Sequence, residues 1–210
     1  MPQIIFCANL RNLRRNRRGR TVTKIENMPH LLSVPSHDLP PDIRCQVVSV
    51  MRIYAWQVFQ SKPIGWDFME PESHPLSFAL VEQEVLISHA LVSWRALTQA
   101  GETYKMYGLS AVFTYPQFEK QGYGRQVVGA ATAHILASDA DAAMLGCKPH
   151  LIPFYAASGW SNMPATQILY GSKSAPTQGG HVMMLFVSEK GRRGRLAFER
   201  EPVYVGAYML

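Results

Sequence analysis

The middle of the sequence constrains the fold more than any other part, because strand and helix patterns alternate there around a glycine-containing loop. The pattern predicts a strand over 103–114, a loop with Gly122 and Gly124, a helix over 124–138 and a short buried strand over 142–147. Tyr115-Pro116 ends the first strand, since proline cannot donate to a strand ladder and restricts the residue before it. Strand, loop, helix and strand in this order predict a βαβ crossover inside a mixed sheet.

Simpler patterns on both sides extend this core. We expect a first amphipathic helix that begins at Pro40-Pro41 and ends before Lys62-Pro63, followed by a loop that covers a site. The remaining predicted elements are a hairpin of strands 76–81 and 85–94, a short helix over 151–158 closed by Gly159, and strands over 167–170 and 181–187 around a loop over 171–180. A chain of 210 residues can bury one sizeable core, so we expect a single domain over 36–210 after an arm over 1–35.

The net charge of +6 is concentrated at the start of the sequence. Residues 1–24 contain seven basic and no acidic residues, so the rest of the chain is close to neutral. The arm has no clear apolar period and includes Pro29 and Pro35, which predicts a mobile segment. Clustered arginines could contact nucleic-acid phosphates. Because only the arm is basic, we do not expect a nucleic-acid partner. An arginine-rich start without acids also fits an organelle transit segment.

Features that the sequence lacks limit the cellular location and the site chemistry that we expect. No apolar stretch is long enough to span a membrane, and no apolar run follows the arginines as it would in a secretory signal. Cys7, Cys45 and Cys147 are widely spaced and form no metal-binding or redox pair, so we expect structural cysteines and no metal. These features favour a reducing, cytoplasmic location. The sequence carries no signature of oligomeric state and is compatible with a homodimer.

The glycine loop has the composition of an anion site. Its glycines stand between a strand and the start of a helix, where unpaired backbone N–H groups and the positive end of the helix dipole favour a phosphate. Lys120 and Arg125 add positive charge on either side of Gly122 and Gly124. The glycine spacing alone also fits an ordinary structural turn. It differs from a dinucleotide-binding loop, because no third glycine follows at the required offset.

Two motifs in this region resemble the GNAT acetyltransferase superfamily. The first runs from Ala111 to Arg125 and resembles motif A, in which a strand leads into (Arg/Gln)-x-x-G-x-(Gly/Ala); Glu119 stands where the family has Arg or Gln. The second, Pro153-Phe154-Tyr155-Ala156-Ala157-Ser158-Gly159-Trp160, looks like the F-Y-x-x-x-G-(F/W) signature. The resemblance implies an α/β fold with a mixed, curved, six- or seven-stranded sheet flanked by about four helices.

The resemblance also implies acetyl-CoA as the acyl donor. The pyrophosphate of coenzyme A would lie on the backbone N–H groups of the glycine loop, and the pantetheine arm would lie along the middle strand like an added strand. The residues at these positions are Val112, Phe113, Thr114, Lys120, Gln121, Gly122, Tyr123, Gly124 and Arg125.

Three residues are candidates for catalysis. Tyr155 falls where the superfamily keeps a tyrosine beside the thioester sulfur, and a phenol near its ordinary pKa stays protonated and can donate. A base is harder to assign, because the middle strand offers only Ser110 and the neighbouring strand only His89. Each of the three also has a plain structural interpretation. Further options are a relay through water and the acids of the covering loop, Asp67, Glu70 and Glu72.

Within the superfamily, the closest pattern is that of the aminoglycoside 2′-N-acetyltransferases, and this match is loose. Those enzymes usually carry a glutamate two positions before the valine of the middle strand, where this chain has Ser110. Their C-terminal region is acidic, as suits a polycationic antibiotic. This chain carries arginines in that region instead, at positions Arg192, Arg193, Arg195 and Arg200.

The sequence therefore predicts an N-acetyltransferase that moves an acetyl group from acetyl-CoA to a primary amine by direct attack in a ternary complex. The expected acceptor is a small molecule. Two alternatives stay open: acetylation of an aminoglycoside-type antibiotic, and a non-catalytic acyl-CoA-binding module. The missing strand acid keeps the second alternative open.

Overall fold

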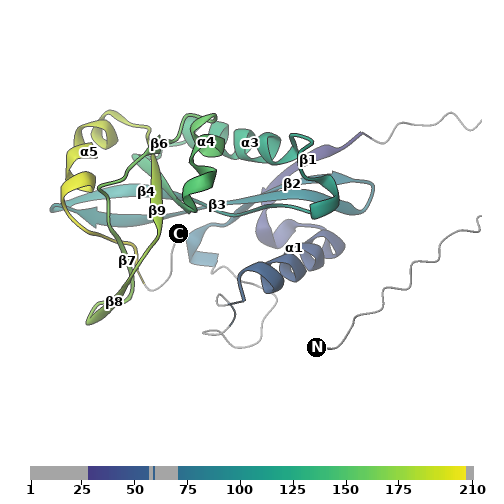
Figure 1. The fold of residues 1–210 in the computed structure, drawn as a ribbon, viewed down its shortest axis with the longest axis horizontal. Helices are drawn as coiled ribbons and strands as arrows, with labels where there is room; N and C mark the ends of the chain where they lie inside the picture. The colour runs from purple at the N-terminus through teal and green to yellow at the C-terminus, as the bar shows by residue number, and fades with distance from the viewer. Residues whose placement is uncertain (1–27, 57–58, 60–70, 207–210) are drawn as a thin grey trace, which may run out of the picture.

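The computed structural model describes residues 28–56, 59 and 71–206, whose arrangement is shown in Figure 1. The strands are β1 (His30–Pro35), β2 (Leu76–Glu82), β3 (Val85–Gln99), β4 (Glu102–Thr114), β5 (Ala142–Cys147), β6 (Ser161–Asn162), β7 (Ile168–Ser172), β8 (Ala175–Gln178), β9 (His181–Phe186) and β10 (Val203–Tyr204). The α-helices are α1 (Pro41–Tyr54), α3 (Tyr123–Ala137), α4 (Ile152–Ala156) and α5 (Glu189–Arg200). Short 3-10 helices lie at Ser36–Asp38, Pro71–Ser73, Pro116–Phe118 and Pro149–Leu151.

Seven strands form one mixed sheet in the order β1-β2-β3-β4-β5-β9-β6, and β10, β7 and β8 form a second, three-stranded sheet. Within the large sheet the β4–β5 pair is parallel, and its crossover connection contains α3. The other pairs of this sheet are antiparallel. The predicted mixed α/β sheet with its βαβ crossover is therefore confirmed.

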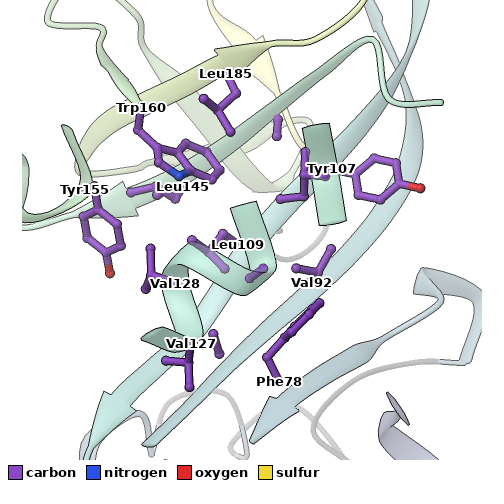
Figure 2. Close-up of a cluster of buried hydrophobic side chains, with 14 of the residues drawn as sticks. Phe78, Val92, Tyr107, Leu109, Val127, Val128, Leu145, Tyr155, Trp160 and Leu185 are labelled. Carbon is purple, nitrogen blue, oxygen red and sulfur yellow. The ribbon is translucent and has the colours of Figure 1, made fainter. Parts of the chain in front are cut away.

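Helices cover both faces of the large sheet. In Figure 1, α3 and α4 lie on one side of strands β2–β4 and α1 lies on the other. The apolar side of α3, including Val127, Val128 and Ile135, packs on residues of β2, β3, β4, β5 and β9, and Figure 2 shows part of this cluster. On the opposite face, Ile43 and Val47 of α1 pack against residues of β2 and β3. The spacing of apolar residues along both helices accounts for this two-sided core.

Helix α1 is shorter than its apolar pattern predicts. It begins at Pro41, where the missing proline N–H costs no intrahelical bond, and it ends at Tyr54. Ile53 and Tyr54 are 73% and 69% exposed, so the described core offers this last turn no packing surface. The covering loop expected after the helix lies largely outside the described residues, which resume at Pro71.

The first strand corrects the expected boundary of the N-terminal arm. Residues 30–35 form β1, which pairs antiparallel with β2 in a register from His30↔Val81 to Pro35↔Leu76. Leu32 and Val34 are half-buried against the cluster under α1, and this contact explains why the segment is ordered despite its prolines. Residues 1–27, which carry the basic charge of the expected arm, lie outside the described residues.

The position of β1 leads to a prediction for two truncations. Removing residues 1–28 leaves all of β1 in place, so we expect the thermal unfolding midpoint to stay within a few degrees of the full chain. Removing residues 1–35 takes away β1, exposes the edge of β2 and uncovers the cluster contacted by Leu32 and Val34. This longer truncation is expected to unfold at a lower temperature and to aggregate. A large loss from the shorter truncation would show that residues before β1 belong to the domain.

The C-terminal part contains elements that the sequence pattern does not reveal, namely β6, β8, α5 and β10. The predicted loop over 171–180 contains β8, which pairs with β7 in a hairpin. All four β8 residues are exposed, so this strand has no apolar alternation by which it could be recognised. Helix α5 is not predicted from the sequence because it contains glycines, which normally disfavour a helix.

Close packing explains the glycines of α5. A Cβ atom at Gly191 would lie 1.8 Å from the backbone oxygen of Asp141, and one at Gly194 would lie 2.4 Å from the Tyr104 hydroxyl. Ser188 caps the helix, because its hydroxyl oxygen accepts from the Gly191 N–H at 3.0 Å. The glycines therefore let the helix backbone dock directly on Asp141, just before β5, and on Tyr104 of β4.

Candidate functional site

Strands β4 and β5 separate in the middle of the large sheet. Their parallel pairing covers three residue pairs, from Met106↔Ala142 to Gly108↔Met144. Beyond this point β4 continues to Thr114 along β3, and β5 continues to Cys147 along β9. The two strand ends thus diverge, which creates an opening between β4 and β5 at the carboxyl end of both strands.

A β-bulge changes the course of β4 at this opening. Ser110 pairs with Leu91 and Phe113 pairs with His89, so two β4 residues stand opposite one residue of β3. The first of these, Ala111, has a φ of 46°, which is uncommon for a residue with a side chain. Such a bulge bends a strand and increases its local twist. Ala111 and Val112 therefore leave the regular ladder where the opening begins, and pairing with β3 resumes at Phe113 and Thr114.

The loop between β4 and α3 presents a row of unpaired donors. Within the described chain, the backbone N–H groups of residues 120–124 donate no hydrogen bond, whereas the next two N–H groups both bond to the Gly122 carbonyl oxygen. Gly122 caps α3 with a φ of 86°, and Lys120 has a φ of 62°. Five consecutive free N–H groups at a helix start can bind an anion.

Gly124 brings this loop close to the end of β4. A Cβ atom at this position would lie 3.2 Å from the Thr114 side-chain oxygen and 3.6 Å from a ring carbon of Phe154. The glycine is therefore required for close approach, whereas Gly122 is required for its positive φ.

These elements surround a cavity of about 470 Å³, a volume typical of small-molecule sites. Its lining consists of Val112, Phe113, Thr114, Phe118, Glu119, Lys120, Gly122, Tyr123, Gly124, Arg125, Leu151, Phe154 and Tyr155. The structure thus brings together every residue predicted for cofactor binding except Gln121, and it adds Tyr155. Phe118, Leu151 and Phe154 were not predicted as lining residues, although Phe154 belongs to the second motif.

Tyr155 lies where α4 meets the cavity. It is 7% exposed, and burial raises the pKa of its hydroxyl to about 12. Within the described residues no hydrogen bond to this hydroxyl is formed. In Figure 2 the ring stands at the margin of the α3 cluster with its oxygen on the side away from Trp160. At neutral pH the group is therefore protonated and free to donate.

His89 and Ser110 do not line the cavity. His89 is fully buried, and its ring nitrogens lie 3.0 Å from the Ala111 carbonyl oxygen and 3.2 Å from the Ser77 hydroxyl oxygen. Burial lowers the pKa of His89 to about 4, although its hydrogen bond to the Ala111 carbonyl opposes this effect. These contacts favour a structural task for His89 over proton transfer. Ser110 is half-buried on β4, directly before the bulge.

Other predicted groups are placed apart from the cavity. Glu72 is exposed in the 3-10 helix before β2, and Asp67 and Glu70 lie outside the described residues. Cys45 is exposed on α1, and burial raises the pKa of the Cys147 thiol above its ordinary value. Among the described residues, no group of three or more His, Cys, Asp or Glu side chains could hold a metal ion.

A second cavity of about 470 Å³ lies near the opposite end of α3. Its lining includes Leu136, Leu185, Phe186, Arg192 and Arg195. Two of the four C-terminal arginines therefore face this cavity and not the glycine loop. Arg192 donates to the Val187 carbonyl oxygen at 2.7 Å, and Arg195 pairs with Glu199 at 3.0 Å.

Solved structures of acyltransferases share this fold at low sequence identity. A GNAT family N-acetyltransferase from Escherichia coli, YhbS, in complex with CoA, gives a TM-score of 0.58 at 14% identity over 84% of this chain and 88% of that chain. An acyl-CoA N-acyltransferase from Pseudomonas aeruginosa gives 0.51 at 13% identity, with 75% and 99% covered. A conserved protein of unknown function from Enterococcus faecalis gives 0.50 at 16% identity over 69% of this chain, which spans 38% of that protein's length.

No family model and no curated protein matches the sequence. The structural matches nevertheless establish the architecture: the fold is that of the GNAT N-acetyltransferases, as the two sequence motifs predict. Among the described helices, none has the length and apolar character needed to cross a membrane.

Proposed function

We propose that this protein is an N-acetyltransferase that moves an acetyl group from acetyl-CoA to a primary amine of a small molecule. The observation that carries the proposal is the shared cavity, in which free N–H groups at the start of α3 and the Tyr155 hydroxyl face the opening between β4 and β5. Anion binding and hydrogen-bond donation to the departing sulfur are two tasks that such a transfer requires. The solved YhbS structure, which contains CoA and has the same fold, supports the choice of donor.

The lining residues fit coenzyme A chemically. The N–H groups of residues 120–124 would hold the pyrophosphate, and Lys120 and Arg125 add positive charge at the same end of the cavity. Val112, Phe113 and Thr114 would hold the pantetheine arm along the bulged end of β4. Glu119 is the exception, because its carboxylate lines the same cavity and repels phosphate. Its side chain is exposed, so solvent screens this repulsion.

Bound acetyl-CoA would supply an activated acyl group, whose carbon–sulfur bond breaks as the amine nitrogen bonds to the carbonyl carbon. The Tyr155 hydroxyl donates toward the departing sulfur, and its raised pKa keeps it protonated for this task. The proton that the amine loses passes to water. Ser110, directly before the bulge of β4, lies outside the cavity lining and is not assigned to this step. Both reactants are held together, so the transfer is direct and needs no acyl-enzyme.

Thiol release tests this proposal. We expect the full-length protein to release free thiol from acetyl-CoA when a set of small primary amines is supplied, at a rate above that of hydrolysis without amine. Calorimetry with coenzyme A should show saturable binding in the same preparation. Saturable binding without thiol release for any amine would mean a non-catalytic acyl-CoA-binding module. Absence of binding would contradict the proposed function altogether.

A further inference from the structure

A line of buried and part-buried hydrogen bonds connects the end of β1 to the bulge of β4. Ser36, which directly follows β1, lies 2.8 Å from the Ser77 hydroxyl oxygen. Ser77 in turn contacts His89 on β3, and His89 contacts the Ala111 carbonyl oxygen. Ser77 and His89 are at most 1% exposed. Polar groups this deeply buried are retained at a cost unless each of them is paired, as these are.

The direction of these hydrogen bonds follows from chemistry. A carbonyl oxygen can only accept, so Nδ1 of His89 carries the proton and donates to Ala111. Burial keeps the imidazole neutral, which leaves Nε2 as an acceptor for the Ser77 hydroxyl. The Ser77 oxygen then accepts from Ser36. Every step thus leads toward the carbonyl of Ala111, the residue with the positive φ.

Ser88, one residue before His89 on β3, makes a second set of hydrogen bonds to β4. Its hydroxyl donates to the Phe113 carbonyl oxygen at 2.9 Å, and its oxygen lies 2.9 Å from the Thr114 hydroxyl. Because the single Ser88 proton is used for Phe113, the Thr114 hydroxyl donates to Ser88. Thr114 also faces the position of Gly124 at the start of α3. Side chains of β3 therefore hold both ends of the bulged segment of β4.

Such support matters because a bulge interrupts the ladder. The backbone around Ala111 occupies a sparsely populated conformation, which persists only where its surroundings hold it. We propose that His89 and Ser88 are positioning residues, which fix the bulged end of β4 so that Val112, Phe113 and Thr114 can hold the pantetheine arm of the acyl donor. This inference rests on the proposed function, and it assigns His89 a task that does not require contact with substrate.

The proposal separates the two halves of coenzyme A. The glycine loop would bind the nucleotide half, whereas the end of β4 would bind the pantetheine half. Changes at His89 or Ser88 should therefore weaken binding of coenzyme A while leaving binding of adenosine 3′-phosphate 5′-diphosphate, which lacks pantetheine, nearly unchanged. A variant that is merely less stable would affect both ligands equally.

Calorimetry with both ligands tests this on His89→Leu and Ser88→Ala. We expect the dissociation constant for coenzyme A to rise about tenfold or more in each, as expected when about 1.4 kcal/mol of binding free energy is lost, while that for the nucleotide stays within about twofold. His89→Asn keeps a side-chain N–H on the Ala111 side and should restore most of the coenzyme A affinity. Hydrogen exchange of residues 110–114 should be faster in His89→Leu than in the unchanged protein.

Ser77→Ala is the matched control. It removes the partner of Nε2 but leaves the bond from Nδ1 to Ala111, so it should lower stability without changing coenzyme A affinity. If His89→Leu does not fold, Ser88→Ala and His89→Asn decide the result. Equal loss of both ligands in a folded variant, or no loss of either, would overturn the positioning role. Failure of the unchanged protein to bind coenzyme A would instead remove the proposed function.

Discussion

Replacing either glycine of the phosphate loop with valine is expected to abolish coenzyme A binding. At Gly122 a β-branched residue cannot adopt a φ of 86° without strain, so the free N–H groups of the loop would turn away from the anion. At Gly124 the added Cβ would lie 3.2 Å from the Thr114 oxygen, and the methyl groups would occupy the cavity. Losing two N–H donors to a charged phosphate costs about 3–6 kcal/mol, which corresponds to an affinity loss of roughly 100-fold or more.

Gly129→Ala provides the control for these two variants. Gly129 lies on the same helix, its φ is in the ordinary range, and a Cβ atom there would meet nothing within 4 Å. This variant should therefore fold and bind coenzyme A like the unchanged protein. Calorimetry that gives unchanged affinity for both valine variants would show that the phosphate-loop assignment is wrong.

Tyr155→Phe is expected to lower turnover by about 100-fold or more, because general acids and oriented donors typically contribute this much. A thiol has an ordinary pKa of about 8.5, so complete proton transfer from a phenol whose pKa is raised to about 12 is uphill. The hydroxyl should therefore act mainly by donating a hydrogen bond as negative charge develops on the sulfur. The ring and its packing are kept, so coenzyme A affinity and thermal stability should change little.

The measurement is single-turnover thiol release, which reports the chemical step. Tyr170→Phe serves as the control, since Tyr170 lies on β7 of the three-stranded sheet, outside the cavity lining. It should match the unchanged protein in rate. If the single-turnover rate of Tyr155→Phe equals that of the unchanged protein, Tyr155 has only a packing role in the core.

Most elements with a clear apolar face could be predicted from the sequence, whereas β1 was missed although Leu32 and Val34 pack on the core. Strand β5 was predicted with the boundaries that the structure has, since its buried run is flanked by polar residues. Strand β8 is exposed throughout, and α5 contains glycines that only its packing on Asp141 and Tyr104 explains. Neither feature leaves a periodic signal, because backbone pairing and backbone contact do not depend on side-chain pattern.

The candidate site was predictable where backbone geometry requires particular residues. A positive φ and a close approach both require glycine, so Gly122 and Gly124 stand out in the sequence. His89 could be noticed but its task could not be inferred, because no local pattern indicates that its ring reaches Ala111 on another strand. The bulge itself depends on the register between β3 and β4, which the sequence does not show.

Because β4 and β5 pair over only three residues, a ligand bound in the opening between them would add to the stability of the folded protein. Three residue pairs form the backbone connection between the two halves of the large sheet, and a ligand in the opening would contact β4 on one side and α4 on the other. Any ligand that binds only the folded state adds to its stability, by about 2.7 kcal/mol when its free concentration is 100 times the dissociation constant. For an enzyme of the proposed kind, resistance to proteolysis would then rise and fall with the abundance of its acyl donor.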